Sequence, residues 1–275
     1  MGVAAAQVPE PCGPAGGWPD GMACVTGGTF VIGDNEGRPD ERPAGEVTLS
    51  SFFMDVTEVT NTAYRACMAA GDCPRHARYV GFLRGRQPVV GVSWQGAVDF
   101  CRSRGKRLPT DAEFERAARG ERNTRFPWGD DEANVCDHAL VRTRRGTGCG
   151  TEVTADVGSR PAGHFGLRDI AGSVHEWVAD RYSPCLRGCA RACGDACFGT
   201  NPRGPCADEA SCPGHPLRSI RGGSWYWPAE RARGAARRGA RPTNEAGHRF
   251  GFRCAQSVEA ALRSRLSTNQ PENPE

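Results

Sequence analysis

The chain has 275 residues, of which 38% are hydrophobic and 24% are charged. This composition is ordinary for a soluble globular protein, and the length is sufficient to bury a core. The formal net charge of +3 is too small to indicate a nucleic acid or a membrane surface as partner, and no stretch is apolar enough to span a bilayer. The 36 glycines and 20 prolines predict a fold rich in turns and loops.

The 14 cysteines are the most informative part of the composition. Their number is even, and most lie in short segments rich in glycine, proline and aspartate. In a reducing cytosol such a set would have to bind metal, whereas in an oxidising compartment it forms disulfides. The sequence therefore predicts an extracytoplasmic protein, whether periplasmic, surface-exposed or secreted. Residues 1–11 lack the basic and apolar regions of a signal peptide, so no leader is visible.

Regular elements are predicted mainly in the first half of the chain. Residues 1–21 are rich in proline and glycine and are expected to be poorly ordered, with Cys12 and Cys24 close enough to pair. Alternating apolar residues predict strands at 29–33, 46–49 and 52–55. Helices are predicted at 62–70, 94–104 and 111–119. Their N-capping residues are Thr60 or Asn61, then Ser93, and then Thr110, which forms a capping box with Glu113.

Further cysteine pairs are expected within short segments. Cys67 and Cys73 flank the end of the first helix and are predicted to pair. Residues 182–216 form a cysteine-dense insertion without Cys-x2-Cys spacing, so three disulfides are favoured over a zinc or iron–sulfur site. Their pairing stays open, because six cysteines permit fifteen connectivities. The six are Cys185, Cys189, Cys193, Cys197, Cys206 and Cys212.

Beyond residue 126 the regular periodicity fades, apart from a compact loop-plus-strand segment at 166–177. The polar, proline-containing residues 258–275 are expected to form a disordered tail. There is no internal repeat and no long linker. The sequence therefore predicts a single α+β domain over 22–257 that is loop-rich and low in regular secondary structure.

The stretch from Arg221 to Cys254 is the candidate functional region. Two adjacent glycines precede a serine and three aromatic residues, which indicates a close approach of the backbone to another segment. Arginine beside aromatic rings could hold a carboxylate, phosphate or sulfate group. The alternative is that the arginines bond internally to loop carbonyls and to acids such as Glu176. The candidate binding residues are Ser224, Trp225, Tyr226, Trp227, Arg233, Arg237 and Arg241.

A series of motifs occurs in a fixed order along the chain. They lie at 27–30, 57–61, 92–94, 106–115, 127–129, 166–172, 176–177, 221–225 and 251–254. In this order they resemble the formylglycine-generating enzyme (sulfatase-modifying factor) family over residues 25–256. The resemblance implies that family's variant of the C-type-lectin-like fold. It also implies a disulfide between Cys101 and Cys254.

The same resemblance argues against the family's oxidase activity. The oxidases convert a substrate cysteine to formylglycine with copper(I) held by two cysteines, and those positions are Trp227 and Ala232 here. Copper(I) requires soft thiolate ligands, so copper is not expected as a cofactor. A second family disulfide would need cysteines at Ala118 and Arg237, and neither is present.

Calcium is the cofactor that the resemblance does imply. One family site falls on Asn134 and the carbonyl of Val135, where an expected aspartate falls near Cys149 and a Cys136–Cys149 disulfide is the alternative clamp. The second site corresponds to a loop whose carboxylate and carbonyl oxygens suit a hard cation. Its residues are Asp169, Ile170, Gly172 and Val174.

Two functions are compatible with these observations. The first is an exported, disulfide-stabilised family member without cysteine-oxidase activity, which binds a small anionic ligand or a partner protein on the face formed by residues 224–241. The second is an oxidoreductase or tailoring enzyme that acts without the copper cysteines, with Glu230 as candidate base and Ser224 beside it. Nucleic acid is not expected as a partner for either.

Overall fold

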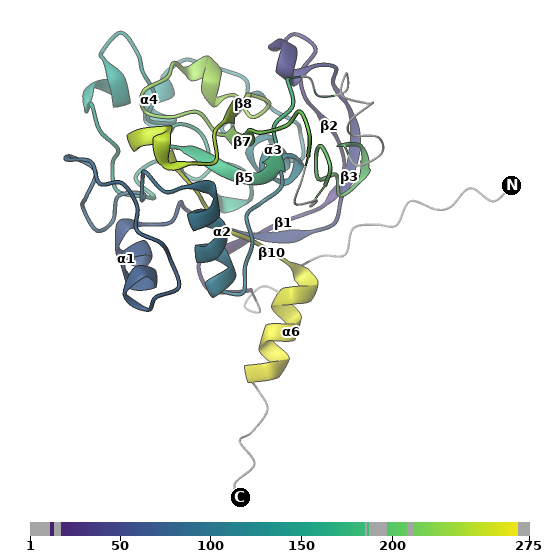
Figure 1. Cartoon of the computed structure of the whole chain (residues 1–275). Helices are drawn as coiled ribbons and strands as arrows, with labels where there is room; N and C mark the ends of the chain where they lie inside the picture. The colour runs from purple at the N-terminus through teal and green to yellow at the C-terminus, as the bar shows by residue number, and fades with distance from the viewer. Residues whose placement is uncertain (1–11, 14–17, 185, 187–196, 208–211, 269–275) are drawn as a thin grey trace, which may run out of the picture.

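The computed structural model describes residues 12–13, 18–184, 186, 197–207 and 212–268 (Figure 1). Helices and strands are short and are joined by long loops, which confirms the predicted α+β, loop-rich class. The described α-helices are α1 (Asn61–Ala69), α2 (Trp94–Ser103), α3 (Asp111–Arg119), α4 (Val135–His138) and α6 (Val258–Thr268).

The described strands form three small sheets. One has the order β1-β4-β10, with β1 at Met22–Val25, β4 at Phe52–Asp55 and β10 at Ala255–Ser257. The second has the order β2-β3-β6, with β2 at Gly28–Ile32, β3 at Gly45–Leu49 and β6 at Gly199–Thr200. The third has the order β8-β7-β5-β9, with β8 at Arg237–Ala240, β7 at Arg218–Arg221, β5 at His175–Arg181 and β9 at Phe250–Gly251.

The first three helices begin where the capping residues predicted. The hydroxyl of Thr60 accepts the amide N–H of Ala63, and that of Ser93 accepts the amide N–H of Gly96. Thr110 and Glu113 form the reciprocal capping box that fixes the start of α3.

Helix α3 occupies the centre of the molecule, where it contacts β2, β3, β5 and β7 (Figure 1). Its apolar residues Phe114, Ala117 and Ala118 are buried in the main core. Its acidic residues Asp111 and Glu115 are buried as well. Buried carboxylates need charged or hydrogen-bonding partners, so α3 determines where arginines of neighbouring elements must lie.

Disulfides join the chain over short and long separations. The four predicted pairs are bonded in the structure: Cys12–Cys24, Cys67–Cys73, Cys101–Cys254 and Cys136–Cys149. In the insertion, Cys206 is bonded to Cys212 and Cys197 is also disulfide-bonded, whereas Cys185, Cys189 and Cys193 lie outside the described residues. No described cysteine is free.

The predicted disordered tail at 258–275 is wrong for its first part. Residues 258–268 form α6, whose Ala261 packs against Cys12, Met22 and Phe53. This contact gives the helix an apolar partner that the polar sequence did not reveal. At the other end, Cys12 is buried within the predicted poorly ordered segment, of which residues 1–11 and 14–17 lie outside the described part. Both ends of the described chain thus meet at the sheet β1-β4-β10.

No described helix is long and apolar enough to cross a membrane.

The long-range disulfide should dominate the stability contributed by the cysteines. Cys101 and Cys254 are 153 residues apart, whereas Cys67 and Cys73 are 6 apart. By loop-closure entropy, replacing both cysteines of the first pair with alanine should lower the free energy of unfolding by about 5 kcal/mol, against about 2 kcal/mol for the second. Denaturant unfolding of the two double variants measures the difference, and an equal loss in both would contradict it.

Candidate functional site

The glycine pair after β7 lets two segments touch. Gly222 and Gly223 have φ of +81° and +74°, a left-handed backbone that favours glycine. A side-chain carbon on Gly223 would lie 2.8 Å from the carbonyl oxygen of Arg231 and 2.9 Å from the Cα of Ala232. The close approach expected from the sequence is therefore the contact between Gly223 and the short 3-10 helix η5 (Ala229–Ala232).

Two arginines of this sheet are bonded to α3. The guanidinium of Arg221 lies 3.1 Å from Asp111 and 2.6 Å from Glu115. Arg237 lies 2.6 Å from Asp111 and donates to two backbone carbonyls. Both arginines are buried, and their charges are paired with the carboxylates of α3 inside the protein.

Arg233 also forms ion pairs inside the protein, but with acids near the start of the chain. It lies 2.9 Å from Asp34 and 2.8 Å from Glu41, beside the 3-10 helix η1 (Pro39–Glu41). Arg233 is only 8% exposed. Arg233 and Arg237 were expected to bind ligand, and the structure assigns both to the internal alternative.

Ser224 and Trp225 also lie below the surface. Ser224 is fully buried, and its hydroxyl has no hydrogen-bond partner among the described residues. The indole N–H of Trp225 donates to the carbonyl of His248 at 3.3 Å, and its ring packs on Phe82. Neither residue belongs to the accessible binding face expected from the sequence.

What remains on the surface is a set of arginines within cation–π distance of aromatic rings. Arg231 and Arg238 approach the ring of Trp227 at 5.9 Å and 5.3 Å, and Arg249 lies 4.9 Å from the ring of Tyr226. We call these five residues the basic aromatic face. A cation–π contact is made through the ring face and does not use the N–H donors of the guanidinium group, which could bind an anion.

Positive charge on this face is poorly compensated. Arg238 has no ion pair among the described residues, and the pKa of its guanidinium is lowered by burial and by the charges of Arg231 and Arg249. Among the described residues, Glu230 lies 3.7 Å from Arg231 and is largely exposed to solvent. An exposed pair of this kind contributes little, so the face carries net positive charge.

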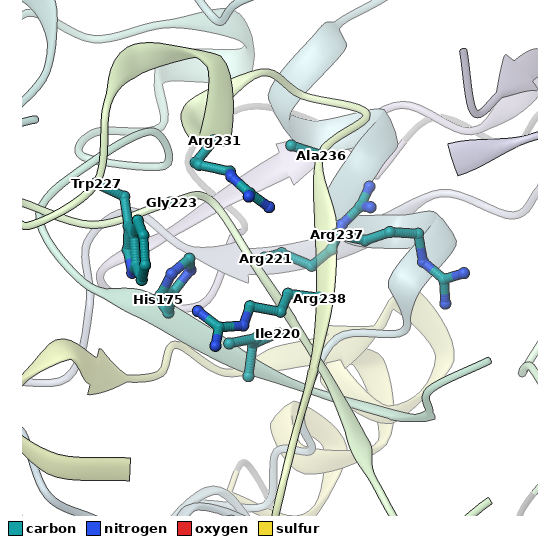
Figure 2. Close-up of a pocket in the computed structure, with 9 residues that line it drawn as sticks. All are labelled: His175, Ile220, Arg221, Gly223, Trp227, Arg231, Ala236, Arg237 and Arg238. Atoms are coloured by element: carbon teal, nitrogen blue, oxygen red, sulfur yellow. The ribbon is translucent and has the colours of Figure 1, made fainter. Parts of the chain in front are cut away.

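A small cavity opens beside this face (Figure 2). Its volume of about 10 Å³ gives room for about one water molecule. The rings of His175 and Trp227 lie next to each other at one end, and the side chains of Arg231 and Arg238 extend toward the cavity from two different segments. The guanidinium groups of Arg221 and Arg237 point away from it.

His175 is the unusual residue of this cavity. It is buried, and one side of its ring interacts with the backbone of Arg221. Burial, with the charge of Arg238 as a further cause, lowers the pKa of its imidazole to about 3. The ring is therefore neutral at physiological pH and offers one donor and one acceptor nitrogen.

The structure gives no support to Glu230 or Ser224 as catalytic groups. Glu230 does not line the cavity, and Ser224 is enclosed. At the two positions where the resemblance places copper thiolates, Trp227 walls the cavity and Ala232 is buried against Gly223.

A second polar cluster lies beneath the loop expected to bind calcium. Glu58, Asp169 and Glu176 are buried around Arg253, which takes both carboxylate oxygens of Glu176 at 2.7 and 2.8 Å. Asp169 accepts the amide N–H of Gly158. The carboxylate of Glu58 lies beside the side chain of Ser173 and near the charge of Arg253. Arg160 and Arg168 also act on Asp169, so three carboxylates and three guanidinium groups meet in this cluster.

Two carboxyl groups of this cluster have raised pKa values. Burial, followed by the charge of Asp169, raises the pKa of Glu58 well above its usual value. Burial also raises the pKa of Asp169. Glu58 and Asp169 thus fit a hard cation. No group of three or more His, Cys, Asp or Glu side chains among the described residues has metal-ligand geometry, so carbonyls of the loop at 169–174 would have to complete the ligand set.

The other expected calcium site has no such feature. Asn134 is exposed at the start of α4, and Val135 is half-buried. None of the unpaired buried oxygens in the described part of the chain belongs to either residue. The Cys136–Cys149 disulfide clamps this segment, as the alternative expected from the sequence required.

With this geometry described, comparison with known proteins identifies the family. The family model described as "Sulfatase-modifying factor enzyme 1-like domain" matches residues 14–258. The chain belongs to the sulfatase-modifying factor family. The formylglycine-generating enzyme of Streptomyces coelicolor is 32% identical to it over 299 residues, which cover 87% of this chain and 90% of that enzyme.

Two other relatives differ from each other in their names and in their lengths. The inactive C-alpha-formylglycine-generating enzyme 2 of Mus musculus is 27% identical, with 86% of each chain covered. The serine/threonine-protein kinase pkn1 of Chlamydia caviae is 30% identical over 262 residues, which cover 86% of this chain but only 38% of the kinase. The chain therefore spans less than half the length of that relative.

A solved structure confirms the family's fold. PvdO from Pseudomonas aeruginosa superposes with a TM-score of 0.69 at 27% identity, covering 86% of this chain and 94% of PvdO.

Sequence reasoning left several site residues out of the candidate set: His175, Arg231, Arg238, Arg249 and Glu58. His175 could have been noticed as an ionisable residue in a strand that is otherwise buried. Arg238 could have been separated from Arg237, because neighbouring strand residues face opposite sides. Nothing in the local sequence marks Glu58 as a member of a buried cluster, since its surroundings come from distant segments.

The distinction between internal and surface arginines can be tested by stability. Arg233→Gln leaves Glu41 buried without its partner and should lower the free energy of unfolding by about 3–5 kcal/mol. Arg238→Gln removes a charge without an ion pair and should change it by less than about 0.5 kcal/mol. Denaturant unfolding of both variants checks this, and a comparable loss in Arg238→Gln would show that this arginine is structural too.

Proposed function

We propose that this chain is an exported, disulfide-stabilised member of the sulfatase-modifying factor family that does not oxidise cysteine. Its function would be to bind an anionic ligand through the basic aromatic face. The observation that carries this proposal is the arrangement of Arg231, Arg238 and Arg249. All three lie within cation–π distance of aromatic rings, and Arg238 lacks a counterion among the described residues.

An anion bound at this face would reduce the electrostatic repulsion between its arginines. Like charges held near one another repel, and this repulsion contributes to the lowered pKa of Arg238. An oxyanion would accept charge-assisted hydrogen bonds from the guanidinium edges and relieve the repulsion. The disulfides support export, because such bonds persist in oxidising compartments.

The lack of oxidase activity follows from the chemistry at two positions. Trp227 and Ala232 offer no thiolate, and the described cysteines are all in disulfides. The mouse relative named an inactive C-alpha-formylglycine-generating enzyme 2 is a precedent within the family. Copper(I) titration, with oxygen uptake measured on a cysteine-containing sulfatase peptide, should show neither stoichiometric copper binding nor turnover. Turnover with bound copper would refute the proposal.

Anion binding can be measured directly with acetate at constant ionic strength. Arg238→Gln should weaken acetate binding by about 10-fold or more, because a charge-assisted hydrogen bond contributes about 1.5–3 kcal/mol. Arg263→Gln is the matched control, since Arg263 is exposed on α6 and pairs only with Glu259 among the described residues. NMR titration of the folded chain gives both affinities. Equal weakening in the two variants would indicate a general charge effect and not a site.

We further propose a structural Ca²⁺ ion held by Glu58 and Asp169. The motivation is the buried Glu58 carboxyl, which has the carboxylate of Asp169 as a close neighbour. At a concentration of Ca²⁺ about 100 times the dissociation constant, binding should stabilise the protein by about 2.7 kcal/mol. Glu58→Gln should abolish this gain, whereas Glu230→Gln, which changes an exposed carboxylate, should keep it.

The pH dependence of stability in the presence of a chelator tests the same cluster in a second way. A carboxyl whose folded-state pKa is raised destabilises the protein as pH rises above the unfolded-state value of about 4.3. In EDTA, Glu58→Gln should therefore be more stable than the unsubstituted protein at pH 7.5, and the difference should shrink as pH falls toward about 4.3. Thermal unfolding with Ca²⁺ and with EDTA measures both effects. An identical response to Ca²⁺ in both proteins would exclude Glu58 as a ligand.

A further inference from the structure

Arg238 borders a second hollow in addition to the cavity beside His175. This groove has a volume of about 280 Å³ and is lined by Leu217, Arg238, Gly239, Ala240, Arg241, Arg249 and Phe250. A cavity of about 150 Å³ is enough to bind benzene, so the groove can hold one ring with a few further atoms. It is too small for a folded partner or a long polymer to be enclosed in it.

The groove and the cavity are neighbours within the fold. Phe250, which lines the groove, lies 5.6 Å from the ring of His175, which lines the cavity. Arg238 lines both. A single ligand bound at Arg238 would therefore meet two different environments: a polar cavity for one atom and a larger groove with apolar walls.

The two environments select different parts of a molecule. The cavity has room for one water-sized group, and the arginines beside it supply N–H donors. His175 adds a neutral imidazole that lines the cavity and also interacts with the backbone of Arg221. The groove offers Leu217, Ala240 and Phe250 as apolar surface, with guanidinium groups at its margin.

We infer that the ligand is a small organic oxyanion, such as a carboxylate or sulfate ester, with a compact apolar body. One oxygen enters the cavity and accepts from Arg238, Arg231 and the N–H of His175, while the apolar body lies in the groove over Phe250 and Ala240. This inference rests on the proposed anion-binding function and names the class of ligand for that site.

Three probes, titrated into the full chain, distinguish the contribution of the oxyanion group from that of the apolar body. Benzoate carries both, acetate carries only the oxyanion group, and benzyl alcohol carries only the ring. NMR titration at constant ionic strength should show benzoate binding about 10-fold or more tighter than acetate, since burying a ring adds apolar contact. Benzyl alcohol should bind more weakly than either anion.

Two variants test the two subsites separately. Ala240→Leu fills the groove and should reduce benzoate affinity to that of acetate while leaving acetate unchanged. His175→Phe keeps a buried ring but removes the donor, and it should weaken both anions by about 5-fold or more. If His175→Phe does not fold, Arg231→Gln replaces it, with the same loss expected for both anions.

The outcomes distinguish this inference from the function on which it rests. Equal affinities for benzoate and acetate would overturn the ligand class, and so would an unchanged difference between the two affinities in Ala240→Leu. Either result would do so even if acetate binding remained sensitive to Arg238→Gln. An unchanged affinity for both anions in His175→Phe would remove the cavity from the site. Anion binding that is insensitive to Arg238→Gln would overturn the proposed function itself.

Discussion

The fold depends on the buried ion pairs that α3 makes with the four-stranded sheet. Asp111 and Glu115 are enclosed with the guanidinium groups of Arg221 and Arg237 at 2.6–3.1 Å. Charges removed from water in this way require close, well-oriented partners, and losing one partner leaves an uncompensated charge. The spacing between α3, β7 and β8 is therefore fixed, and with it the positions of the side chains on the opposite surface of β8.

Strand alternation then separates structure from function within one arginine-rich segment. Arg237 faces α3 and is buried, whereas its neighbour Arg238 faces outward and lies against Trp227. At the two positions where the resemblance places the oxidases' thiolates, this chain has an aromatic residue that lines the cavity and a small buried alanine. The alanine lies directly against the glycine turn, so this turn and η5 are in direct backbone contact.

The sequence was sufficient where the determinants are local. Capping residues located the starts of the helices, and cysteine spacing with the family resemblance identified four disulfides. It was insufficient for the arginines, because the burial of Arg233 depends on Glu41, which lies 192 residues earlier. It also failed for α6, whose polar sequence gains stability from contacts with Cys12 and Phe53 near the other end of the chain. In each failure the deciding partner is distant in sequence.

The meeting of both chain ends at the sheet β1-β4-β10 has a practical consequence for how this protein can be handled. In Figure 1, α6 and the N-terminal strand lie at one end of the molecule, and β8 lies toward the other. A fluorophore attached to α6 would therefore report from the side of the molecule away from β8 and the basic aromatic face.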